Sequence, residues 1–216
     1  MFQTAYTWSK TIDNADFAAG IYGFAPNTRD LSGQRGRASL DVTHNFIGSA
    51  IWDIPLLKDG KSLLSKVIGR WQVSTVYTLR TGMPIQPLAG RDQAGVGSAS
   101  GQRPEVTGNP VIPHGQRSLT RWFNPDVFSQ PALGTFSSLG RNPFTGPGWN
   151  QWDISFTKRV PLGEGRQLEL RADGFNFFNH TQWNGVGVTL TQPATFGRIT
   201  STCNERSFML GTRIQF

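Results

Sequence analysis

The chain has 216 residues, with 21 Lys and Arg against 14 Asp and Glu, which gives a formal net charge of +7. Charged residues make up only 16% and aromatic residues 12%, so the composition fits neither a coiled coil nor a disordered chain. A single cysteine, Cys203, excludes an internal disulfide and a multi-cysteine zinc site. The basic residues are scattered and no zinc-finger or RNP-like segment accompanies them, so we do not expect nucleic acid as a partner.

Apolar and polar residues alternate with a period of two in six segments, which is typical of strands with two different faces. In one of them Trp152, Ile154 and Phe156 alternate with Asp153 and Ser155. The predicted strands cover residues 2–9, 40–54, 71–80, 151–160, 167–174 and 207–216. Between the second and third strands, aliphatic residues within 55–70 could form one short helix. Every apolar run is far shorter than a transmembrane helix requires.

The connections between these strands alternate in length. Residues 161–165 and 55–70 make short or moderate connections, whereas residues 12–37, 87–148 and 179–205 make long ones. This asymmetry is typical of outer-membrane barrels, which have short periplasmic turns and long external loops. We therefore predict an all-β fold, an antiparallel transmembrane β-barrel segment of about six strands.

The polar faces of the predicted strands carry charges of both signs. A watery barrel interior would accommodate them, but so would bulk water around a soluble sheet. A soluble or surface-exposed β-sandwich that binds carbohydrate or protein therefore stays open as the alternative. The charged residues on these faces are Asp41, Arg80, Asp153, Glu169, Arg171, Asp173 and Arg213.

Two tryptophans fall near the short-turn ends of adjacent strands. Trp52 lies near the end of the second predicted strand and Trp71 opens the third, so a barrel would place them at one level. Trp prefers the membrane–water interface because one part of its ring is apolar and another is wet. We predict that Trp52 and Trp71 belong to the interfacial girdle, with ordinary core packing as the alternative.

The last six residues resemble the C-terminal signal that the barrel-assembly machinery reads on bacterial outer-membrane proteins. That signal has a glycine, then an apolar residue and a terminal aromatic, which Gly211, Ile214 and Phe216 match. Met209 departs from the pattern, which usually has a large polar residue two positions before the glycine.

Nearly the whole chain resembles the C-terminal part of TonB-dependent transporters of the Oar-like type, which carry a carboxypeptidase-regulatory-like domain. The order and spacing of several short segments make this resemblance specific. The segments are residues 6–10, 41–46, 71–74, 81–84, 122–124, 140–142, 146–148, 171–180 and 196–200.

The resemblance implies a barrel of about 22 strands that encloses a plug domain. Residues 1–216 would supply the last six strands, and the plug, the regulatory-like domain and the signal peptide would lie outside them. Alone, they would form a curved open sheet, since single-chain bacterial barrels start at eight strands. The implied location is the outer membrane of a Gram-negative-type bacterium. The implied partners are outer-membrane lipid, the barrel-assembly machinery, the TonB complex through the plug, and an unidentified small ligand.

We expect neither enzymatic activity nor a cofactor. The three histidines lie on separate segments without carboxylates or cysteines at metal-ligand spacing, and no nucleophilic triad is visible. The loop of residues 87–148 is the best candidate for ligand contact, because long external loops commonly carry function. A folded lid without ligand contact is the alternative. The candidate ligand contacts are Arg117, Arg121, Trp122, Phe123 and Arg141.

Overall fold

The structure is a computed structural model that describes residues 1–14, 27, 29–55, 69–163 and 165–216. Six long strands form one antiparallel sheet in the order β1-β4-β5-β10-β11-β14. Their bounds are β1 Phe2–Trp8, β4 His44–Asp53, β5 Trp71–Arg80, β10 Trp149–Gly163, β11 Arg166–Phe175 and β14 Ser207–Gln215. All six predicted strands are thus confirmed. The short helix considered within residues 55–70 falls outside the described residues.

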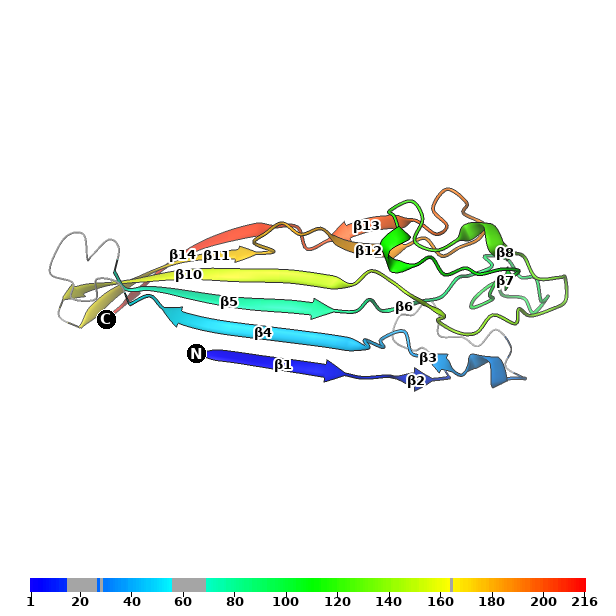
Figure 1. The fold of residues 1–216 in the computed structure, drawn as a ribbon, viewed down its shortest axis with the longest axis horizontal. Helices are drawn as coiled ribbons and strands as arrows, with labels where there is room; N and C mark the ends of the chain where they lie inside the picture. Colours follow the sequence, from blue (N-terminus) through cyan, green and yellow to red (C-terminus); the bar gives the residue numbers. More distant parts are fainter. Residues whose placement is uncertain (15–26, 28, 56–68, 164) are drawn as a thin grey trace.

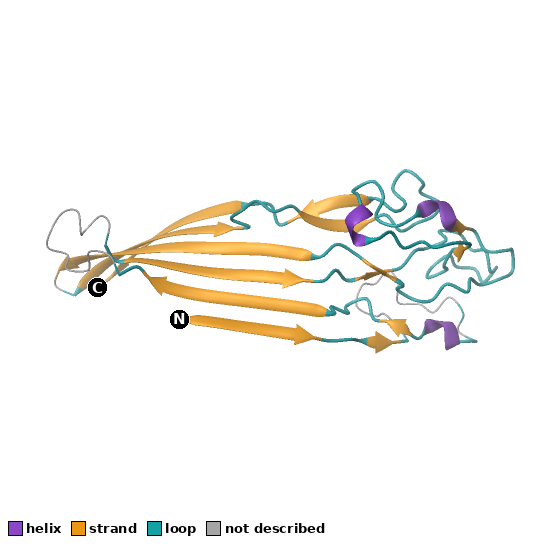
Figure 2. Ribbon diagram, in the orientation of Figure 1, coloured by secondary structure: helices purple, strands orange, loops and turns teal. Residues whose placement is uncertain are grey.

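Short elements gather at one end of the long strands (Figure 1). Four two-stranded ladders, β2-β3, β6-β9, β7-β8 and β12-β13, lie there. The described residues contain 3₁₀-helices at Ser32–Gln34, His114–Gln116 and Pro125–Val127, and no α-helix (Figure 2). The short strands are β2 Ile12–Asp13, β3 Gly36–Arg37, β6 Pro84–Ile85, β7 Glu105–Val106, β8 Phe128–Ser129, β9 Phe144–Thr145, β12 Gln182–Val186 and β13 Ile199–Cys203.

The long sheet is open and has no second sheet packed across it among the described residues. β1 and β14 are its two edges, and the C-terminus lies at the end opposite the short elements (Figure 1). A sandwich would bury one face of this sheet against another sheet. The sandwich alternative therefore does not describe the fold.

One face of the sheet is apolar and rich in aromatic rings. The register places Tyr6 opposite Phe46, and Tyr77 opposite Trp152. The Tyr77 and Trp152 ring centroids lie 4.6 Å apart, and those of Phe46 and Tyr77 lie 6.1 Å apart. At the far edge, Leu210 belongs to this face and is 83% exposed. The apolar side chains thus form a surface rather than a core.

The other face carries a network of polar side chains between neighbouring strands. Arg159 Nε lies 3.2 Å from a carboxylate oxygen of Glu169, and Gln72 Nε2 donates to Asp53 at 2.8 Å. These partners lie directly opposite one another in the register. Period-two alternation alone therefore separates the two faces, because each strand presents successive side chains to opposite sides.

The second predicted strand begins later than the sequence suggested. Residues 40–43 lie before β4, and Asp41 is 1% exposed instead of lying in the middle of a polar face. Its carboxylate accepts from the Thr11 backbone N–H at 2.7 Å and from Arg37 Nε at 3.0 Å. A buried carboxylate requires such partners, and this local bonding replaces the strand ladder.

Candidate ligand-receiving site at the loop end of the sheet

Residues 81–148 and 176–206, named here the loop layer, contain the only cluster of buried aromatic residues found among the described residues. Phe123, Phe128, Phe144 and Phe196 make up this cluster. The Phe123 ring lies 5.1 Å from Phe196 and 5.4 Å from both Phe128 and Phe144, measured between centroids. The long connections are therefore folded together around an aromatic core.

A buried polar cluster ties the segment before β4 to this layer. Arg103, itself buried, donates to the Gly33 and Leu139 carbonyls at 3.0 and 2.7 Å and to Gln34 Oε1 at 2.7 Å. Burial, aided by the nearby charge of Arg141, lowers the pKa of the Arg103 guanidinium. These bonds satisfy a cation that burial would otherwise make costly.

A backbone crossing connects the sheet to the loop layer. Gly146 N donates to the Met83 carbonyl at 2.8 Å, and the β6-β9 ladder continues from there. Gly82 is buried at the crossing, where a Cβ atom would lie 2.0 Å from the Gly146 carbonyl oxygen. Glycine is thus required at position 82 because two backbones meet there without room for a side chain.

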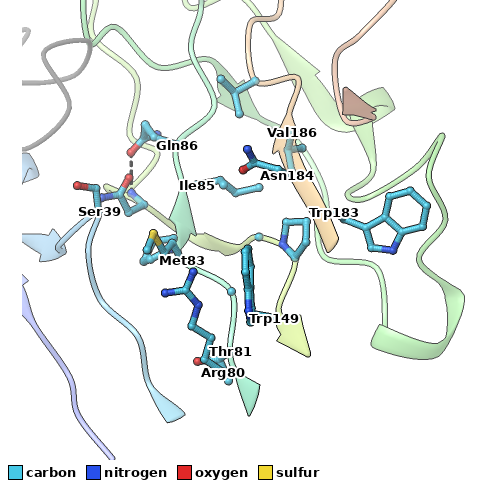
Figure 3. Close-up of a pocket in the computed structure, with 17 residues that line it drawn as sticks. Ser39, Arg80, Thr81, Met83, Ile85, Gln86, Trp149, Trp183, Asn184 and Val186 are labelled. Carbon is cyan, nitrogen blue, oxygen red and sulfur yellow. Dashed lines mark hydrogen bonds between the residues drawn. The ribbon is translucent and has the colours of Figure 1, made fainter. Parts of the chain in front are cut away.

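Gly82, Gly146 and Pro147 at this crossing line both of two hollows. The first hollow has a volume of about 380 Å³ and is lined at one end by Arg80 and Trp149 and elsewhere by Ile85, Gln86 and Asn184 (Figure 3). Arg80 closes β5 and Trp149 opens β10, and they are direct partners in the register. The Arg80 guanidinium carbon lies 4.9 Å from the centroid of the Trp149 ring.

The second hollow has a volume of about 550 Å³ and shares Arg80, Trp149 and Trp183 with the first. It is also lined by Arg117 and Trp122, whose guanidinium carbon and ring centroid lie 5.2 Å apart. Two arginine–tryptophan pairs, supplied by the sheet and by the loop layer, therefore line one space. Its volume lies within the range typical of small-molecule sites, roughly 300–1,000 Å³.

The five predicted ligand contacts separate in the structure. Arg117 and Trp122 line the second hollow. Phe123 is 2% exposed at the centre of the aromatic core, and Arg141 pairs with Asp13 at 2.5 Å and donates to the Gln34 carbonyl at 3.2 Å. We therefore assign Phe123 and Arg141 structural roles in place of ligand contacts. Arg121 lies outside both hollows and pairs with Asp126 at 2.7 Å.

Sequence reasoning missed Arg80, Trp149, Trp183 and His180 as cavity residues. Alternation places Arg80 on a polar strand face, and it gives no signal for His180. The available signal was an aromatic or cationic residue directly at the loop end of a predicted strand, as for Arg80 and Trp149. Alternation could not show that these ends converge on one hollow.

The described residues offer no group of three or more His, Cys, Asp or Glu side chains arranged to hold a metal ion. Within the same residues, no helix has the length and apolar character to cross a membrane.

Comparison with known proteins identifies the architecture. Residues 1–213 match the family described as outer membrane beta barrel domain. The chain belongs to this family. Searches of curated proteins and of solved structures gave no match. Membership supports a location embedded in the outer membrane, and it assigns the apolar face of the sheet to lipid and the polar face to the barrel interior.

The predicted girdle and assembly signal can now be placed on this outer-membrane barrel sheet. Trp52 and Trp71 lie on the lipid-facing side at the end opposite the loop layer, and Trp52 is 61% exposed. Gly211 and Ile214 lie on the edge strand β14, and Phe216 follows it and is 94% exposed. Their roles as interfacial anchors and as an assembly signal remain predictions.

Proposed function

We propose that this chain forms the wall and the external ligand-receiving loops of an outer-membrane TonB-dependent transporter of the Oar-like type. In this proposal its six strands are part of a larger barrel, and the loop layer makes first contact with a scarce small ligand. A plug elsewhere in the complete transporter gates entry and contacts the TonB complex. The chain itself carries out no chemical step.

The observation that carries the proposal is the pair of hollows at the loop end of the sheet. The described part of the loop layer has its own aromatic core, and the hollows lie where that layer meets β5 and β10. A simple diffusion channel has no need for such a built cavity. If a ligand is captured there and then released into the barrel, cationic and aromatic side chains are expected at the loop end of the sheet, where they line the hollows.

The polar face of the sheet also supports the proposal of a transporter whose barrel encloses a plug. Arg171 Nε lies 2.8 Å from an Asp173 carboxylate oxygen, and Asp173 also accepts from the Ser155 hydroxyl. Asp153 accepts from Gln151 and from the Asn176 backbone N–H at 2.8 and 2.9 Å. A lumen filled by a folded plug offers a partner for such a fixed pattern of donors and acceptors.

Capture by TonB tests the proposal. The full-length gene product would be expressed in an outer-membrane-bearing host, and its outer membranes would be incubated with the purified periplasmic domain of TonB from the same bacterium. We expect the protein in the detergent-extracted outer membrane with heat-modifiable gel mobility, and we expect it to retain TonB.

An outer-membrane protein that does not retain TonB, and that admits small solutes without the proton-motive force, would overturn the transporter proposal and leave the barrel assignment intact. An unrelated outer-membrane barrel produced in the same host serves as the control for nonspecific retention of TonB.

A further inference from the structure

We propose that the second hollow binds a flat anion, a planar ring bearing carboxylate or similar oxygen acceptors, which lies beside its tryptophans and is held by Arg80 and Arg117. The inference rests on the proposed function in so far as this anion would be the captured ligand.

Charge alone favours an anion. The described residues that line the two hollows include Arg80 and Arg117 and no carboxylate. The loop of residues 81–148 contains five arginines and three acidic residues, so the surroundings do not reverse this sign. Two cations that approach one cavity repel each other, and an anion placed between them relieves that repulsion.

Arg80 brings unused hydrogen-bond donors to the cavity. Within the described residues the Arg80 side chain makes no ion pair or hydrogen bond, and its guanidinium stacks on Trp149. An arginine fork matches a carboxylate or another planar oxygen acceptor in two parallel bonds. A neutral sugar would leave the two charges without a counter-charge.

One arginine–tryptophan pair of the second hollow, Arg117 and Trp122, is held in place before any ligand arrives. Trp122 Nε1 donates to the Thr145 carbonyl at 3.0 Å, which fixes the ring against which Arg117 stacks. Arg117 Nε donates to the Ile112 carbonyl at 3.0 Å, and its other guanidinium nitrogens make no hydrogen bond within the described residues. Side chains fixed in this way lose little entropy on binding. The flat rings of Trp122, Trp149 and Trp183 also line the hollow, which favours a planar ligand over a globular one.

Benzene-1,3,5-tricarboxylate is a suitable probe because it is flat, soluble and anionic. Its binding to the full-length protein in detergent would be measured by calorimetry, with benzene-1,3,5-tricarboxamide as the neutral control of the same shape. We expect the tricarboxylate to bind at least about tenfold more tightly, and raising the salt concentration to weaken it.

Substitutions locate the site. Arg80→Gln and Arg117→Gln should each weaken tricarboxylate binding by about tenfold or more, the size expected for a lost charge-assisted bond. Arg121→Gln removes a cation from the same loop outside the hollow and should leave binding unchanged. Heat-modifiable mobility confirms that each variant is a folded barrel.

Equal affinity for the tricarboxylate and the triamide, or an equal loss in all three variants, would overturn the inference. Its failure is distinguishable from failure of the proposed function. Anion binding without TonB retention contradicts only the transporter, and TonB retention without anion binding contradicts only the ligand class.

Discussion

The long strands and the loop layer bury their apolar side chains in opposite ways. Leu210 and Trp152 of the sheet are exposed, at 83% and 38% of their surface, whereas Phe123 of the loop layer is 2% exposed. Lipid solvates the apolar face of a membrane sheet, so its strands require no internal core. Loops in water must bury their own apolar groups to hold one conformation. Two kinds of solvent thus produce two kinds of packing in one chain.

The largest expected loss of stability comes from a substitution that unfolds the loop layer and leaves the sheet folded. Phe123→Ala removes the ring at the centre of the aromatic core and should cost about 3–5 kcal/mol of loop-layer stability. We expect rapid protease cleavage within residues 81–148 while the barrel keeps its heat-modifiable mobility. Phe136→Ala, at a ring that is 37% exposed, is the matched control and should change cleavage little. If Phe123→Ala lost both the protease resistance of residues 81–148 and the heat-modifiable mobility of the barrel, the two regions would fold as one unit.

A charge on the lipid face should destabilise the barrel sheet and leave the aromatic core of the loop layer intact. Leu210→Arg near the middle of β14 is expected to cost about 2–4 kcal/mol, measured as the urea midpoint of the full-length barrel in bilayers. Met209→Arg, one residue away, lies on the polar face opposite Asp173 and should cost far less. Equal costs would mean that β14 does not present Leu210 to lipid.

The crossing between the two regions is expected to give a smaller effect. Gly82→Ala places a Cβ atom 2.0 Å from the Gly146 carbonyl oxygen, so the backbones must separate at a cost of about 1–3 kcal/mol. We expect faster hydrogen exchange at β6 and β9 and a change in the fluorescence of Trp149. Gly140→Ala, where a Cβ meets nothing within 4 Å, is the control. An unaltered exchange rate in Gly82→Ala would contradict the close crossing.

The smallest effect concerns one loop turn and its dependence on pH. Asp92 accepts from the Gln102 amide at 2.6 Å, and this hydrogen bond lowers the pKa of the Asp92 carboxyl. Because the folded pKa lies below the unfolded value of about 3.9, the stabilisation is present above that value and is lost as the pH falls through the folded pKa. The protection of residues 92–102 against hydrogen exchange, relative to the intrinsic rate at each pH, should fall below about pH 4 in the native protein. Asp92→Asn should remove this acid step. An identical acid step in both proteins would show that another group is responsible.

Alternation in the sequence was sufficient to predict the six long strands, their antiparallel order and the two faces of the sheet. That information is local, because each strand shows successive side chains to opposite sides whatever its neighbours are. The same reasoning misplaced Asp41 on a polar strand face. Its carboxylate bonds to Thr11 and Arg37, and no strand pattern records such contacts.

The five residues predicted to contact ligand lie in different surroundings in the structure. Arg117 and Trp122 line the second hollow, whereas Phe123 lies in the aromatic core and Arg141 pairs with Asp13, although these four residues share the same two kinds of side chain, cationic and aromatic. Residue type and loop membership do not say which side of a folded loop a side chain occupies. Arg80, Trp149 and Trp183 come from segments about 70 and 30 residues apart, and their meeting depends on how those segments fold back on one another.

The sequence by itself therefore determined the strand pattern, the lipid-facing and interior-facing residues, and the end of the sheet that carries the long loops. Only the tertiary structure decided that these loops share an aromatic core, that Gly82 and Gly146 cross in contact, and that two arginine–tryptophan pairs line one hollow. The physical reason is the range of the interactions involved: alternation follows from the geometry of each strand, whereas a cavity exists only where distant segments pack.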